Sequence, residues 1–137
     1  RPNNLFVAGF IGSPKMNLLD ATVIKSTPGS VTLQLMGDSK LLVKTDAKVA
    51  TGEKVTVGIR PETIGISKAG TITGSIAVIE RLGSETLCYI DIGDKVLVTI
   101  KVASTAKVDI GQNVNLAVTA GEPILFNAQG VSFLHLE

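Results

Sequence analysis

The sequence has no tryptophan, one tyrosine, one cysteine and one histidine among its 137 residues. The single cysteine, Cys88, cannot form a disulfide within the chain and suggests a reducing compartment. Together with the lone His135, it is too little for a Cys/His metal site. The 13 basic residues nearly balance the 12 acidic ones, and aromatic side chains are scarce. We therefore expect no nucleic-acid partner, because such proteins need a basic surface and stacking platforms.

Motifs that carry catalysis are also missing. The sequence has no G-x-x-x-x-G-K-[ST] phosphate-binding loop. Ser13 follows a glycine but has no evident base, and Cys88 in "ETLCYIDI" has the setting of a small strand residue. No apolar run approaches the roughly 20 residues that a membrane-spanning helix needs. We expect the function to lie in binding rather than in catalysis.

What the sequence does have is alternation of apolar and polar residues with a period of two. This pattern, rich in β-branched side chains, is typical of half-buried strands. Glycine-containing turns separate the segments, and short strands at such spacing predict a sandwich or barrel. The clearest alternating segments are residues 31–35, 55–59, 96–102 and 114–118.

The two ends of the chain differ from this pattern. Residues 3–11 are the only helix candidate besides short turns, with Asn3 or Asn4 as a cap and Gly12 as a stop. The chain ends in Leu136 and Glu137, a pair that cloning sites often leave before a purification tag. We expect a short N-terminal helix and two terminal residues that are not native.

An internal repeat is visible. Ala-Lys-Val-x-x-Gly occurs at 47–52 and again at 106–111, each time followed by an alternating strand. The repeat predicts two β units, near 16–67 and 72–135, that pack together or share strands because each is too small to bury much alone. The alternative is that any two β-meanders resemble one another.

Two short stretches interrupt the strands. In "GIRPE" (58–62), Arg60 and Glu62 flank a proline that removes a backbone donor. They form either a local ion pair of little energetic value or a positioned pair at an interface, and the residues alone favour the ion pair.

The second interruption is "ERLGSET" (80–86). Gly83 predicts a turn or bulge between two strands. The acids Glu80 and Glu85 lie on either side of Leu82. This stretch is either a hairpin with solvated acids or a recognition edge, and composition leaves both open.

Four stretches occur in order along the chain: "FVAGFIGSPKMNLL" (6–19), "VTVGIRPETI" (55–64), "IAVIERLGSETLCYIDI" (76–92) and "GEPILFNAQG" (121–130). Together they resemble the C-terminal region of the ATP-binding subunits of carbohydrate-importing ABC transporters, in the group of the maltose and glycerol-3-phosphate importers. The resemblance implies an all-β regulatory domain built on OB-fold-like elements, often called the transport-associated OB (TOBE) domain. Residues 1–15 would then be the end of a linker helix from a nucleotide-binding domain that this sequence lacks, and 16–137 the OB-like domain.

The resemblance also implies partners. In this family two such domains meet across the two-fold axis of the ATPase dimer, and some members receive regulatory proteins or inhibitory small molecules. Membrane permease subunits are reached through the ATPase domain, so the whole subunit is cytoplasmic and peripheral on the inner face of the cell membrane. ATP and Mg²⁺ bind to the missing domain, which leaves this chain without a cofactor and without catalysis of its own.

Candidate interface residues follow from the family motifs. Phe126 is either an exposed dimer anchor or a core residue of the last hairpin. The chain departs from the family at Thr63, where a His is usual, and at Asn127, where an Asp is usual, so a charge-dependent role at these two positions is in doubt. The candidates are Arg60, Glu62, Glu80, Leu82, Gly83, Glu85 and Phe126.

A different function is the alternative. The second repeat also resembles molybdate-binding OB-type domains, which would make the chain a small oxyanion-binding module. Ser104, Thr105 and Lys107 are the nearest match to such a site. The Ser-Ala-Arg-Asn segment that is characteristic of that family is absent.

Overall fold

The structure is a computed structural model that describes residues 14–130. The helix expected at 3–11, His135, Leu136 and Glu137 lie outside these residues. The described chain is almost entirely β, which confirms the predicted class. Its elements are β1 (Asn17–Thr27), β2 (Ser30–Gln34), β3 (Lys40–Lys44), β4 (Lys54–Ile59), the 3-10 turn η1 (Pro61–Thr63), β5 (Ile64–Ile66), β6 (Ile72–Leu82), β7 (Glu85–Asp91), β8 (Leu97–Ala103), β9 (Asn113–Val118) and β10 (Ile124–Phe126).

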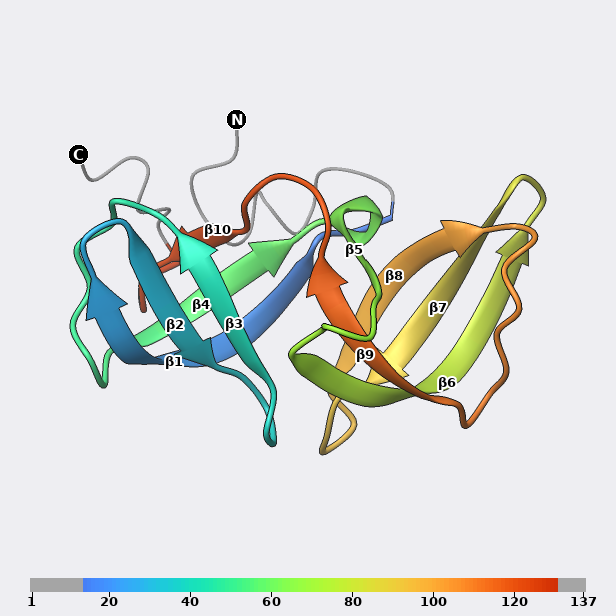
Figure 1. Ribbon diagram of the computed structural model, residues 1–137, viewed down its shortest axis with the longest axis horizontal. Helices are drawn as coiled ribbons and strands as arrows, with labels where there is room; N and C mark the ends of the chain where they lie inside the picture. Colours follow the sequence, from blue (N-terminus) through green and yellow to red (C-terminus); the bar gives the residue numbers. More distant parts are fainter. Residues whose placement is uncertain (1–13, 131–137) are drawn as a thin grey trace.

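Ten strands form two curled five-stranded sheets that lie side by side (Figure 1). The first sheet has the order β10-β4-β1-β2-β3 and the second the order β5-β9-β6-β7-β8. Four consecutive strands of each half therefore take the same Greek-key order, in which the fourth strand returns beside the first. In the second sheet the edge strands β5 and β8 also come near each other, so the sheet is strongly curled.

Each sheet is completed by a strand from the other half of the chain. Strand β5 follows β4 but pairs with β9, with Ile64 opposite Val118. Strand β10 follows β9 but pairs with β4, with Ile124 opposite Gly58. The two halves thus share strands, one of the two arrangements expected from the repeat. The unit boundaries drawn near 16–67 and 72–135 stay a prediction.

The repeat extends to irregular details of the backbone. The first strand of each Greek-key unit carries a bulge, just after Val23 in β1 and just after Ile76 in β6. The Gly52 N–H donates to the Val23 carbonyl at 2.7 Å, and the Gly111 N–H donates to the Ile76 carbonyl at 2.7 Å. Both glycines have a positive φ, 93° and 89°, which only glycine adopts without strain. The Ala-Lys-Val-x-x-Gly motif therefore encodes a loop that closes on the bulge in both halves.

Apolar side chains from both sheets form one continuous core. The alternating residues of the sequence supply it, for example Val31 and Leu33 in β2 and Val98 and Ile100 in β8. A second, smaller cluster consists of Met16 and Phe126, with Leu18 and Ile124 packed against it. Burial of apolar area, at about 25 cal/mol per Å², is the main stabilising term and joins the two halves.

Polar contacts fix how the two sheets meet. The Asn17 side chain, at the start of β1, donates from Nδ2 to the carbonyls of Ile59 (3.0 Å) and Thr99 (2.8 Å). Its Oδ1 accepts from the Thr99 N–H at 2.7 Å. Asn17 thus binds both backbone groups of one residue on β8, as a neighbouring strand would. The buried Ser39 makes a second link, because its Oγ accepts from the Thr73 N–H at 2.9 Å.

Candidate partner-binding surface

The outer face of β6, β7 and β8 carries exposed apolar side chains. The register pairs Val78 with Tyr89 and Leu82 with Glu85, so these residues lie on the face opposite the core. Val78, Leu82 and Leu97 keep 47%, 48% and 45% of their surface exposed. The side chain of Leu87, on the same face, is only 4% exposed. This face therefore combines an apolar centre with exposed apolar margins.

Charged side chains on this face are tied to neighbours on adjacent strands. The Tyr89 hydroxyl donates to Glu80 Oε1 at 2.9 Å, and Lys101 Nζ lies 3.0 Å from Glu85 Oε2. The hydrogen bond to Glu80 is the main reason that the pKa of Tyr89 is raised, with burial and the charge of Glu80 adding to it. The pairs hold their charges at defined places on the sheet, although an exposed ion pair itself adds little stability.

The β6–β7 turn has the geometry that was expected. Leu82 pairs with Glu85, which leaves Gly83 and Ser84 as a two-residue loop. Gly83 has a φ of 73°, as the first central residue of a II′ hairpin turn requires. Glu80, Leu82 and Gly83 are exposed and Glu85 half-buried, so the hairpin can be reached by a partner.

Arg60 and Glu62 lie elsewhere. They are exposed on either side of the buried Pro61 in η1, which contacts β8 where the two sheets meet. Figure 1 shows η1 well apart from the tip of the β6–β7 hairpin. Lys101–Glu85 is the one ion pair within residues 14–130. The expectation of a local ion pair between Arg60 and Glu62 is therefore wrong. The turn is held instead by the Thr63 N–H and hydroxyl, which both donate to the Arg60 carbonyl.

Phe126 is not on the surface. Its side chain is 0% exposed and packs against Met16. Of the two expectations, the structure agrees with a core residue, and the exposed anchor is wrong for this chain. Phe126 lies opposite Thr56, on the face of the first sheet away from the main core, where the smaller apolar cluster around Met16 buries it. The predicted interface residues therefore fall in three separate places and not in one patch.

Cys88 faces the core from β7, opposite Ile79 and Ile100. Burial raises the pKa of its thiol, and the charge of Arg81 opposes this only in part. A buried thiol with a raised pKa is a poor nucleophile, in agreement with its expected role as a small strand residue.

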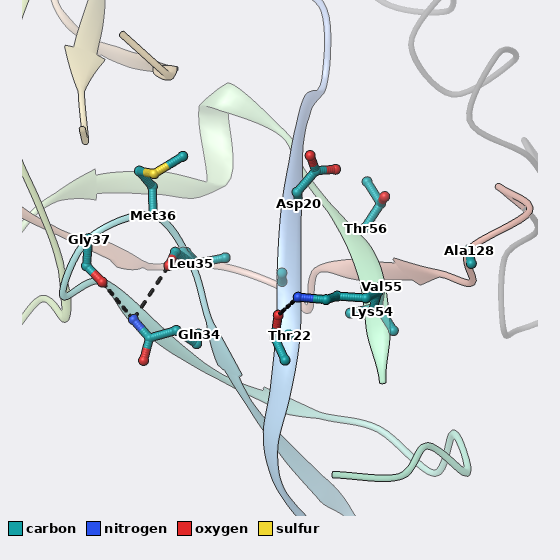
Figure 2. A pocket seen from close by; sticks show the side chains of 11 residues that line it. Asp20, Thr22, Gln34, Leu35, Met36, Gly37, Lys54, Val55, Thr56 and Ala128 are labelled. Atoms are coloured by element: carbon teal, nitrogen blue, oxygen red, sulfur yellow. Dashed lines mark hydrogen bonds between the residues drawn. The ribbon is translucent and has the colours of Figure 1, made fainter. Parts of the chain in front are cut away.

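The structure has two polar grooves that the sequence did not predict. One, of about 520 Å³, is lined by β1, β4 and the end of β2, with Asp20 and Lys54 among its residues (Figure 2). The other, of about 580 Å³, is lined by the equivalent strands β6, β7 and β9 of the second sheet. The signal in the sequence is weak, because each groove depends on polar side chains from three separate strands.

Residues proposed for an oxyanion site are all on the surface. Ser104, Thr105 and Lys107 are exposed in the connection between β8 and β9. Within residues 14–130 no group of three or more His, Cys, Asp or Glu side chains could hold a metal ion. No helix in that same part of the chain is long and apolar enough to cross a membrane.

Comparison with known proteins places this architecture. Residues 12–64 match the model of the MalK OB fold domain, and residues 57–126 match the model of the TOBE domain. The chain therefore belongs to the TOBE domain family. It is a regulatory domain of the kind that ATP-binding subunits of ABC importers carry.

Relatives with sequence similarity cover most of this chain. It is 36% identical over 134 residues to the maltose/maltodextrin import ATP-binding protein MalK of Aliivibrio fischeri, covering 94% of this chain and 36% of the relative. It is 33% identical to the protein of the same name from Vibrio cholerae, with the same coverage. The chain thus spans about a third of the length of these relatives.

A solved structure shares the fold. The cytoplasmic molybdate-binding protein ModG, with molybdate bound, superimposes with a TM-score of 0.69 over 89% of this chain and 99% of its own. The sequence identity is 19%, so this likeness shows the fold alone and carries no ligand over to this chain.

Proposed function

We propose that this chain is the regulatory and dimerisation domain of the ATP-hydrolysing subunit of a sugar importer. The support is the family membership together with relatives named for the import of maltose and maltodextrins. ATP and Mg²⁺ would bind to a nucleotide-binding domain, which these 137 residues do not include. The subunit would lie on the cytoplasmic face of the membrane, reach the permease subunits through that domain, and be open to a regulatory protein or an inhibitory small molecule.

A second copy of this chain is the partner that we assign to the outer face of β6, β7 and β8. The observation that carries this assignment is the exposure of Val78, Leu82 and Leu97 on one face of one sheet. Exposed apolar side chains gathered on one face of a domain are typical of protein interaction sites. The tied charges that lie among these apolar side chains, Glu80 with Tyr89 and Glu85 with Lys101, fix the orientation of a partner more than its affinity.

Sedimentation equilibrium over a wide concentration range tests this assignment. We expect the chain to self-associate, and Leu82→Ser to weaken the association at least tenfold, a loss of about 1.4 kcal/mol. Leu42→Ser is the matched control, because Leu42 is also an exposed strand leucine but lies on β3 of the first sheet. Both variants should unfold at the same denaturant concentration as the parent, since neither side chain is in the core.

Three results would count against the assignment. The chain could stay monomeric at every concentration, in which case dimerisation would depend on other parts of the subunit. Leu42→Ser could weaken association as much as Leu82→Ser does, which would place the contact on the first sheet. Leu82→Ser could leave association unchanged, which would remove this face from the interface.

A further inference from the structure

The groove on the first sheet gathers polar side chains of both charge signs on one outer face. The register places Asp20 opposite Thr56, and Thr22 opposite both Lys54 and Gln34. Alternation of side chains along strands puts all five on the same side of the sheet. Figure 2 shows these side chains around the hollow between β1, β4 and the end of β2.

Hydrogen bonds hold two of these side chains in place. Lys54 Nζ donates to Thr22 Oγ1 at 3.0 Å, and an ammonium group has two further N–H donors. Gln34 Nε2 donates to the carbonyl of Gly37 at 2.8 Å, which leaves the Gln34 side-chain oxygen as an acceptor. Met36, from the β2–β3 turn, adds an apolar wall. The groove therefore offers donors, acceptors and an apolar surface together.

The charges of the groove do not neutralise each other by direct contact. In the described part of the chain the one ion pair is Lys101–Glu85, so the Asp20 carboxylate and the Lys54 ammonium do not form one. An anion attracted by Lys54 would be repelled by Asp20, and a cation attracted by Asp20 would be repelled by Lys54. A hydroxyl group both donates and accepts, so a neutral molecule with several hydroxyls can satisfy both charged side chains.

The second sheet provides an internal comparison. Its groove lies at the equivalent place, with Asn113 where the first sheet has Lys54, and Asp91 where it has Gln34. The Asp91 carboxylate accepts from the Gly93 N–H at 2.9 Å, and this groove has no basic lining residue. The fold thus makes the hollow twice, and side chains of both charge signs line only the first.

We propose that the groove around Asp20, Gln34 and Lys54 binds a neutral polyhydroxylated molecule of the size of a mono- or disaccharide. Because the proposal rests on the lining of the groove, it stands or falls independently of dimerisation through the second sheet. Such a ligand would also touch the β2–β3 turn, where Gly37 lies close to the backbone of Ile92, just after β7. A bound molecule would therefore contact a turn that lies at the junction of the two sheets.

Titration of the isotopically labelled chain, followed by amide chemical shifts, tests the proposal. The probes are maltose, as a neutral disaccharide, and inorganic phosphate, as an anion. We expect maltose to give saturable shifts at Asp20, Gln34 and Lys54 with a Kd on the order of 1 mM, since the groove is shallow. Lys54→Met should weaken binding roughly 3- to 10-fold, which corresponds to one or two hydrogen bonds.

Asn113→Ala, at the equivalent position of the second groove, is the matched control and should leave binding unchanged. The proposal is wrong if maltose gives no saturable shifts, or if they fall in the second groove. It is also wrong if phosphate shifts the same amides at lower concentration than maltose, because the groove would then be an anion site. Equal binding by the parent chain and by Lys54→Met would likewise exclude it.

Discussion

Asn17 joins the two sheets through its side chain, and its replacement should destabilise the whole domain. Asn17→Ala removes three hydrogen bonds, two to carbonyls of Ile59 and Thr99 and one from the Thr99 N–H. A typical bond of this kind contributes about 1 kcal/mol. Because Thr99 is only half-buried, water replaces part of the loss. We expect a decrease of about 2 to 3 kcal/mol in the free energy of unfolding, out of the roughly 5 to 15 kcal/mol that is usual for a domain.

Asn17→Asp separates the role of the donor from that of the acceptor. The carboxylate can still accept from the Thr99 N–H, but its second oxygen would face the carbonyls of Ile59 and Thr99, which also accept. This arrangement disfavours the charged form and raises the carboxyl pKa in the folded state above about 3.9. Protonation restores a donor, so stability is greatest below that value and falls as the pH rises through the folded-state pKa.

Urea denaturation followed by circular dichroism, at neutral pH and at pH values towards 4, measures both effects. Asn113→Ala is the control, because Asn113 is an exposed asparagine on β9 whose replacement should change stability by less than about 0.5 kcal/mol. The reasoning fails if Asn17→Ala costs no more than this control. It also fails if Asn17→Asp, relative to the parent, gains nothing on acidification.

Two further predictions concern single contacts. Gly58→Ala should destabilise the domain by about 1 to 3 kcal/mol in the same assay, because its new Cβ would lie 2.5 Å from the sulfur of the buried Met16. Gly65→Ala is the control and should be tolerated, because its Cβ would meet no atom closer than 3.8 Å. Equal losses would contradict the packing argument. The phenolate absorbance of Tyr89, the one tyrosine of the chain, should titrate above about 10 and move back towards that value in Glu80→Gln, since the Glu80 contact raises its pKa. The raised pKa of Tyr89 implies a contribution to folding stability that is complete below the ordinary tyrosine pKa and is lost as the pH rises through the pKa of the folded state. An unchanged titration midpoint in Glu80→Gln would refute the role of Glu80.

Local features of the sequence predicted what depends on neighbouring residues. The alternation at 31–35 and 55–59 predicted β2 and β4 to within one residue, because apolar side chains at every second position can be buried only on one face of a strand. Gly83 predicted the turn at the tip of the β6–β7 hairpin. The Ala-Lys-Val-x-x-Gly repeat predicted two equivalent units, and the two sheets do have the same strand order.

What remained undetermined depends on residues that are distant in the sequence. A three-residue strand such as β5 or β10 has the same local pattern whichever sheet it joins, so only tertiary packing decides the exchange of strands. The burial of Phe126 follows from that exchange, because β10 crosses back to pair with β4. In the sequence Asn17 is an ordinary polar residue, and its role depends on β8, which only the tertiary structure brings within hydrogen-bonding distance. The sequence by itself determined strands, turns and the repeat, whereas the tertiary structure decided which strands pair and which side chains therefore remain on the surface.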